Sequence, residues 1–164
     1  MARPNGRAVF HHRDSAGKAE TAPIEYMKWA QKEAKRLNVK FTGTPLQISE
    51  MIAQGISCQD DIFLDYGVTG DQMNRLGLNA LLKEIERDKS ISHVLVPLRD
   101  RLARPQRPED GVRIEHQICE LGIHLVFMDK TLLPIEIGQQ PELADSLVST
   151  VEYHHAGKFS RDLS

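Results

Sequence analysis

The stretch VLVPLRDRLAR (residues 94–104) decides the fold, because it joins a short apolar strand to a cluster of three arginines and one aspartate. A smaller cluster lies upstream, where the apolar run AVF (residues 8–10) leads through two histidines to Arg13 and Ser15. In a parallel α/β sheet, the carboxyl ends of the strands display the side chains that carry the chemistry. A hydroxyl nucleophile beside guanidinium groups suits phosphoryl transfer, because the positive charges stabilise the phosphate oxygens. The two segments together predict a phosphoryl-transfer site with a serine nucleophile.

Length and composition are typical of one soluble globular domain. The chain has 164 residues, of which 40% are hydrophobic and 27% charged, so it can bury a core without disulfides or metals. The formal net charge is −2, so a nucleic-acid partner would require local basic residues or another domain. Cys58 and Cys119 form no metal motif, and Cys119 falls at a helical apolar position typical of a buried thiol. This cysteine usage fits a reducing cytoplasm, so we expect a cytoplasmic protein. The sequence shows neither a signal peptide nor an apolar run near the roughly 20 residues of a membrane span.

Alternating strand and helix patterns predict an α/β fold. Four short apolar runs are predicted strands, namely residues 8–12, 61–64, 93–97 and 123–128. Three of them lack polar alternation, which is usual for strands buried on both faces of a largely parallel sheet. Apolar residues at helical spacing lie between them, at residues 24–37, 78–85 and 112–121, and residues 45–54 could form another short helix. We therefore expect a mostly parallel central sheet of four to five strands flanked by helices, in a three-layer sandwich.

The C-terminal segment differs from the rest of the chain. The residues Leu143, Leu147, Val151, His155, Phe159 and Leu163 recur every four positions, and all but the histidine are apolar. This spacing predicts a first unit over residues 1–141, followed by a long helix over residues 142–164. Such a helix either packs on the sheet or extends to meet a partner, and the sequence favours neither. The pattern runs to Ser164 without a capping signal, as in a piece of a longer protein with DNA-binding domains beyond it.

Three motifs follow one another in a fixed order along the chain. HHRDS (residues 11–15) ends the first predicted strand, GVTG (67–70) precedes RLGL (75–78), and DRLAR (100–104) follows the valine-rich strand. They resemble the serine recombinases, whose catalytic domain has Tyr-x-Arg-x-Ser, then Val-Ser-Gly with Arg-x-Gly-Leu, then Asp-Arg-Leu-x-Arg. The resemblance covers nearly the whole chain from Arg7 onward. The C-terminal FSRDLS (159–164) looks like the corresponding helix of the large serine integrases.

The resemblance implies a fold, a mechanism and a set of site residues. The fold would be the resolvase-like sandwich, and the serine would attack a DNA phosphodiester to form a 5′-phosphoserine link, releasing a 3′-hydroxyl. The implied catalytic residues are Ser15, Arg13, Arg75, Asp100, Arg101 and Arg104, with Thr69 as a further phosphate-binding candidate. The arginines would stabilise the phosphate charge through paired hydrogen bonds, and the aspartate would orient an arginine or assist proton transfer to the leaving oxygen. No cofactor and no metal are expected, since the sequence offers no convincing carboxylate cluster for Mg²⁺.

The resemblance also implies partners. The family acts as a dimer that pairs into a tetramer on two DNA sites, and we expect no membrane partner. DNA binding by this chain alone should be weak and without sequence preference, since no motif offers a recognition helix.

Departures from the family pattern leave alternatives open. His11 replaces the family's tyrosine, Thr69 replaces its serine, and residues 41–59 look like an insertion. One alternative is a non-catalytic assembly module that keeps the fold and binds partners through the terminal helix. Another is a flavodoxin-like nucleotide-binding domain, although no glycine-rich phosphate loop follows any predicted strand. The DRLAR segment taken alone is often a solvated face with ion pairs. The adjacent His11 and His12 should point to opposite faces of their strand, which argues against a zinc site.

Overall fold

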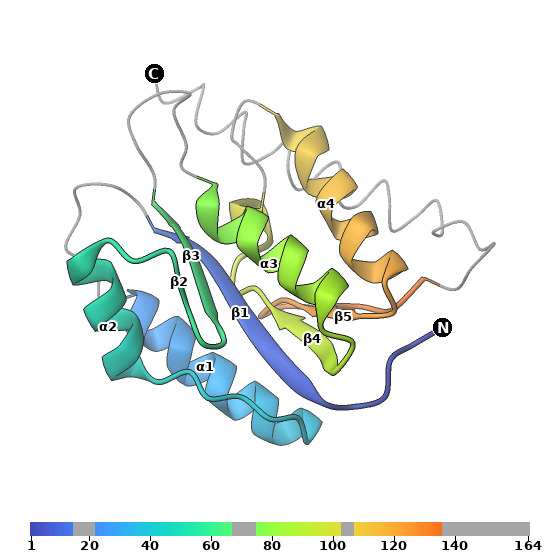
Figure 1. Cartoon of the computed structure of the whole chain (residues 1–164), viewed down its shortest axis with the longest axis horizontal. Helices are drawn as coiled ribbons and strands as arrows, with labels where there is room; N and C mark the ends of the chain where they lie inside the picture. The colour runs from blue at the N-terminus through green and yellow to red at the C-terminus, as the bar shows by residue number, and fades with distance from the viewer. Residues whose placement is uncertain (15–21, 67–74, 103–106, 136–164) are drawn as a thin grey trace.

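Strand β1 (Arg7–Asp14) lies inside a six-stranded sheet in the computed structural model, which describes residues 1–14, 22–66, 75–102 and 107–135 (Figure 1). The strand order is β2-β3-β1-β4-β5-β6. The four inner strands are parallel: β1, β3 (Ile62–Tyr66), β4 (Ile91–Leu95) and β5 (His124–Val126). This arrangement confirms the predicted mostly parallel sheet.

The two edge strands were not predicted from the sequence. Strands β2 (Cys58–Gln59) and β6 (Thr131–Leu132) each pair antiparallel with their neighbour, so the sheet has more strands than the four to five expected. Two residues are too few to show an apolar period, which explains why the pattern missed them. The inner strands also differ from the expected bounds by one or two residues at each end.

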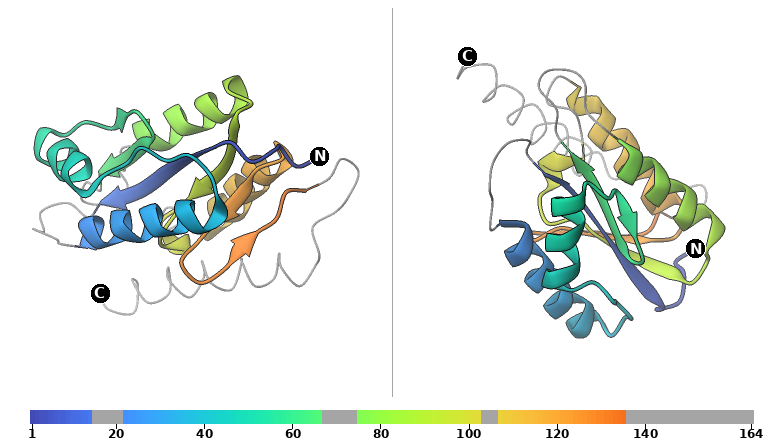
Figure 2. Two further views of the ribbon diagram at one scale, coloured as in Figure 1. Left: turned by 90° about the horizontal axis from the view of Figure 1, so that it is seen from below. Right: turned by 60° about the vertical axis from the view of Figure 1, so that its left-hand side comes forward.

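Helices cover both faces of the sheet (Figures 1 and 2). Helices α1 (Ala22–Leu37) and α2 (Pro45–Gln54) pack on one face, and α3 (Leu76–Arg87) and α4 (Pro108–Glu120) pack on the other. The predicted three-layer arrangement is therefore confirmed. None of the helices in the described part of the chain is long and apolar enough to cross a membrane.

Local signals explain the bounds of α2. The Thr44 side chain accepts a hydrogen bond from the Gln47 amide, and Pro45 occupies the first helical turn, where a missing N–H costs nothing. Gly55 ends the helix with φ 68°, a left-handed conformation that favours glycine. The segment that looked like an insertion therefore contains a properly capped helix packed against α1.

A separate apolar core fills each side of the sheet. Val9, Val94 and Leu125 face the core under α3 and α4, and Phe10 and Leu95 face the core under α1 and α2. All five residues of β4 are buried, which confirms the interpretation that these strands are covered on both faces. Cys119 is buried in the α3–α4 core as expected, and burial raises the pKa of its thiol to about 12.

An ion-pair cluster closes the amino end of the sheet. Arg7 bonds to Asp61 at 2.5 Å, to Asp88 at 2.9 Å and to Glu84 at 3.3 Å. Asp61 also accepts hydrogen bonds from the backbone and hydroxyl of Thr42. The cluster ties the start of β1 to the end of α3, at the opposite end from the carboxyl ends of the strands.

The predicted long helix over residues 142–164 lies outside the described residues, as do Ser15, Thr69 and Arg104.

Candidate active site at the carboxyl end of the sheet

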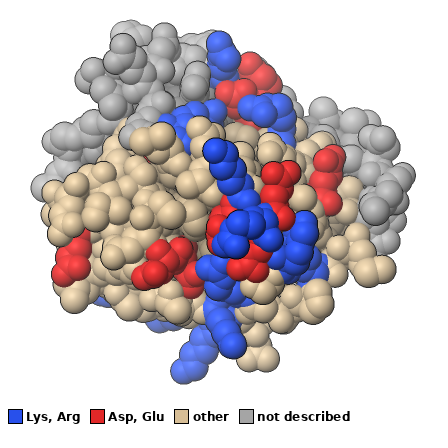
Figure 3. Space-filling model, viewed as in Figure 1, with Lys and Arg blue, Asp and Glu red and all other residues tan. Residues whose placement is uncertain are grey.

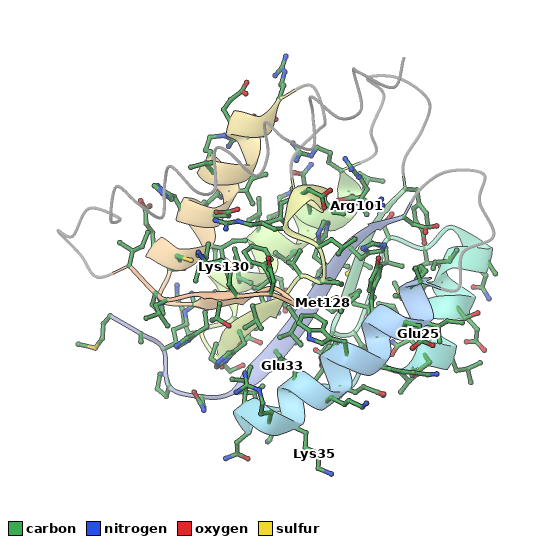
Figure 4. All side chains as sticks on the ribbon, turned by 180° about the vertical axis from the view of Figure 1, so that it is seen from behind. Glu25, Glu33, Lys35, Arg101, Met128 and Lys130 are labelled. Atoms are coloured by element: carbon green, nitrogen blue, oxygen red, sulfur yellow. The ribbon has the colours of Figure 1, made fainter. Side chains whose placement is uncertain are left out.

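Three of the predicted arginines come together from separate segments. Arg13 lies near the end of β1, Arg75 immediately precedes α3, and Arg101 ends the short helical turn η1 (Arg99–Arg101) after β4. Arg101 Nη1 donates to the Arg13 carbonyl at 3.3 Å. Figure 4 shows Arg101 in the upper half of the view, well away from Lys35 of α1 at the bottom. The fold thus gathers residues that are up to 88 positions apart in the sequence.

Two contacts of Arg75 tie it to neighbouring segments. Its Nη2 donates to the Leu102 carbonyl at 2.8 Å, and its Nη1 lies 3.6 Å from Asp110 Oδ2 on α4. The first contact joins the start of α3 to the segment that follows η1. Because Leu102 directly follows Arg101, this bond fixes Arg75 relative to Arg101.

Positive charge is concentrated around Arg13. Burial lowers the pKa of the Arg13 guanidinium below its usual value, and the charges of Arg101 and Arg75 lower it further. The carboxylates of Asp100 and Asp65 raise the pKa of Arg13, so both lie close enough to interact electrostatically with its guanidinium. A bound anion would relieve the mutual repulsion of the arginines, so the arrangement suits a phosphate group.

Asp65 belongs to this site, although the sequence analysis did not select it. It lies opposite Arg13 in the register of β1 and β3. Its Oδ1 accepts from the Gly77 amide at 2.9 Å, and its Oδ2 accepts from the Leu78 amide at 3.2 Å. It thus caps α3, where the residue at the N-cap position, Arg75, makes no side-chain capping bond. A carboxylate directly after the predicted strand 61–64 was the signal that could have revealed it.

Gly77 lets α3 sit directly on β3. A Cβ at this position would lie 2.2 Å from the Leu64 carbonyl oxygen. The glycine therefore permits the close approach that brings the helix start to Asp65 and sets the position of Arg75.

The two adjacent histidines point to opposite faces of β1, as predicted. His11 Nε2 donates to Asp65 Oδ2 at 2.8 Å on the α3 side. The His12 ring makes an edge contact with Tyr26 of α1, with ring centroids 5.0 Å apart. Burial, together with the charge of Arg101, lowers the pKa of His12 to about 3, so its imidazole is neutral at neutral pH.

Asp100 is exposed, whereas its neighbour Arg99 is buried against Glu115. The arginines of the VLVPLRDRLAR stretch, of which Arg101 and Arg104 were predicted site residues, do not all lie in one place. Arg101 faces the end of β1, Arg99 turns into the α4 layer, and Arg104 lies outside the described residues.

A family model described as "Resolvase, N terminal domain" matches residues 40–150. The chain belongs to this family, the catalytic-type domain of the serine recombinases, which act on DNA. Among the curated proteins, none matches the chain. The matched region contains Asp65, Arg75 and the DRLAR segment, whereas β1 with Arg13 precedes it. Because β1 pairs with both β3 and β4, its carboxyl end nevertheless adjoins the matched residues.

Proposed function

We propose that the chain is the catalytic domain of a serine site-specific recombinase, with Ser15 as its nucleophile. The observation that supports this proposal is the gathering of Arg13, Arg75 and Arg101 at the end of β1, two residues before Ser15. The C-terminal sequence favours the large serine integrases within the family.

The proposed reaction is an exchange of phosphodiester bonds. The Ser15 hydroxyl oxygen attacks the phosphorus, the bond from phosphorus to the 3′-oxygen breaks, and the 3′-oxygen leaves with a proton. The DNA 5′-phosphate is then linked to the serine. After strand exchange, a 3′-hydroxyl attacks the phosphoserine and releases the enzyme. Each step exchanges one phosphate ester bond for another, so the reaction needs no nucleoside triphosphate.

The arginines would supply the stabilisation that this transfer needs. Charge builds up on the phosphate oxygens, and guanidinium groups bind such oxygens through planar paired hydrogen bonds. In other phosphoryl-transfer sites an arginine of this kind contributes about 10³-fold or more in rate. In this proposal Arg13, Arg75, Arg101 and Arg104 bind the phosphate. Asp100 orients an arginine or assists proton transfer to the leaving oxygen, and Thr69 is a further phosphate contact.

DNA affinity would come largely from outside this domain. The net charge is −2, and Figure 3 shows Lys and Arg intermingled with Asp and Glu on the face it presents. We therefore propose weak, non-specific DNA binding by residues 1–164, and assembly of the intact protein as a dimer that pairs into a tetramer. The segment over residues 142–164 would contribute to the subunit contact and lead on to further domains.

A covalent DNA adduct would test the proposal without knowledge of the target site. The chain is incubated with duplex DNA carrying a randomised central segment and a label at the 3′ or the 5′ end, the reaction is stopped with detergent, and the DNA strands are separated by heating before analysis. A 5′-phosphoserine link retains the 3′-end label on the protein and releases the 5′-end label on a fragment. Ser15→Ala should form no adduct, whereas Arg87→Lys, an exposed arginine at the far end of α3, should react like the wild type. Retention of the 5′-end label, or an adduct in Ser15→Ala, would contradict the proposal.

The same experiment separates the alternative function. A non-catalytic assembly module would form no adduct with any label while still self-associating. The departures at His11 and Thr69 keep this alternative open. His11 Nε2 bonds to Asp65, whereas its Nδ1 is buried without a hydrogen-bond partner among the described residues.

A further inference from the structure

Arg99 and Glu115 form a buried, two-bond ion pair beside the proposed active site. Arg99 Nε donates to Glu115 Oε2 at 2.9 Å, and Nη2 donates to Oε1 at 2.8 Å. Both residues are at most 5% exposed, and the Arg99 guanidinium lies over the Phe127 ring at 5.3 Å from its centroid. The pair joins η1 to the middle of α4. Phe127, which directly follows β5, covers the Arg99 guanidinium with its ring. This geometry uses the planar fork of arginine, which lysine cannot reproduce.

The η1 turn that Arg99 anchors carries the contacts of the site. The Arg99 carbonyl accepts from the Leu102 amide at 3.2 Å, which closes the turn. From the same turn, Arg101 reaches the Arg13 carbonyl, and the Leu102 carbonyl accepts from Arg75. A shift of η1 would therefore move Arg101 away from β1 and break the bond between Arg75 and the Leu102 carbonyl at the same time.

We infer that the Arg99–Glu115 pair positions the arginine cluster for phosphate binding, and is not merely a stabilising contact of the fold. The inference rests on the proposed function, because it assigns the pair a part in that reaction. Arg99 and Glu115 are positioning residues: they act through η1 on Arg101 and on the Leu102 carbonyl that holds Arg75, and need not touch the DNA themselves.

A buried ion pair adds little net stability to a fold. Two charges lose their hydration on burial, and apolar residues of similar size often replace such pairs with no loss of stability. An apolar pair would, however, lack the two directed bonds that fix the orientation of η1. A displacement of about 1 Å in a catalytic group can cost about 10²-fold in rate. Stability and activity should therefore respond differently when the pair is replaced.

The double variant Arg99→Met, Glu115→Leu separates the two roles. We expect its melting temperature to stay close to that of the wild type, while the adduct rate per folded molecule falls about 10²-fold. Arg99→Lys keeps the charge but loses the planar fork, and it should also lower the adduct rate. This variant tests the inference if the double variant fails to fold. As a control, Arg7→Gln removes an ion-pair cluster at the opposite end of the sheet, and should lose stability without changing the rate per folded molecule.

A second measurement does not depend on activity. The rate at which phenylglyoxal modifies Arg101, followed by peptide mass spectrometry, reports how firmly that side chain is held. We expect several-fold faster modification of Arg101 in the double variant and in Arg99→Lys, and the wild-type rate in Arg7→Gln. An unchanged rate in both Arg99 variants would overturn the inference. If the wild type forms no adduct, the proposed function fails, and the modification rates still decide whether the pair positions Arg101.

Discussion

Replacing Gly77 by alanine has two opposing effects on the free energy of unfolding: a gain in helix propensity and a steric clash with β3. Alanine favours a helix over glycine by about 1 kcal/mol, so local propensity alone predicts a more stable protein. The new Cβ, however, would lie 2.2 Å from the Leu64 oxygen and 2.5 Å from its carbonyl carbon, and ordinary contacts are about 1 Å longer. Because these are backbone atoms, no rotamer change can relieve the overlap, and α3 must move away from β3. Overpacking of this kind costs about 1–3 kcal/mol.

The clash should outweigh the propensity gain. Because the overlap is with backbone atoms, we take the upper part of that range, about 2–3 kcal/mol. After the helix gain of about 1 kcal/mol, we expect Gly77→Ala to lose about 1–2 kcal/mol, which for a chain of this size lowers the melting temperature by about 2–8 °C. Thermal and urea unfolding measure this directly. Asn79→Ala is the matched control, because Asn79 is exposed on the same helix, and alanine there should be neutral or stabilising by a few tenths of a kcal/mol. A Gly77→Ala variant at least as stable as the wild type would refute the close approach of α3 and β3.

Three further predictions follow from the site and from the C-terminal pattern. Arg101→Lys and Arg104→Lys should each strongly reduce adduct formation while changing unfolding free energy by less than about 1 kcal/mol, and wild-type adduct rates would mean that these arginines do not bind the phosphate. The pKa of His12 is about 3 in the folded protein and 6.5 ordinarily, so the unfolded state binds more protons between these values and stability should fall as pH drops from about 6.5 towards 3. His12→Phe should make this loss shallower in urea titrations from pH 7 to pH 4, and an unchanged slope would count against the buried, neutral imidazole. Sedimentation should show concentration-dependent self-association that is weakened in the Leu147→Asp, Val151→Asp double variant; identical behaviour of both folded proteins would place the subunit contact elsewhere.

The elements with strong local signals were predictable from the sequence. Helix α2 has the bounds expected for residues 45–54, because a threonine cap, a proline at its start and a glycine at its end mark it locally. The uniformly apolar run around Val94 correctly predicted a strand covered on both faces. In each case neighbours in the sequence carry the information.

The features that were missed depend on partners far along the chain. Asp65 became a site residue because α3 places its first amides over the end of β3. The sequence places Arg99 in one cluster with Arg101 and Arg104, whereas its burial depends on Glu115, which lies 16 residues further on. A charged side chain shows no sign in the sequence of whether such a partner will meet it.

The most direct test of the central claim is to locate the DNA linkage on the protein. Trypsin cleaves after Arg13 and Lys18, and the resulting peptide DSAGK (residues 14–18) has Ser15 as its hydroxyl-bearing residue. After reaction with duplex DNA, nuclease digestion and trypsin treatment, mass spectrometry should find this peptide carrying one nucleotide through a 5′-phosphate. A nucleotide attached to any other residue, or a DNA adduct that leaves this peptide unmodified, would contradict the account.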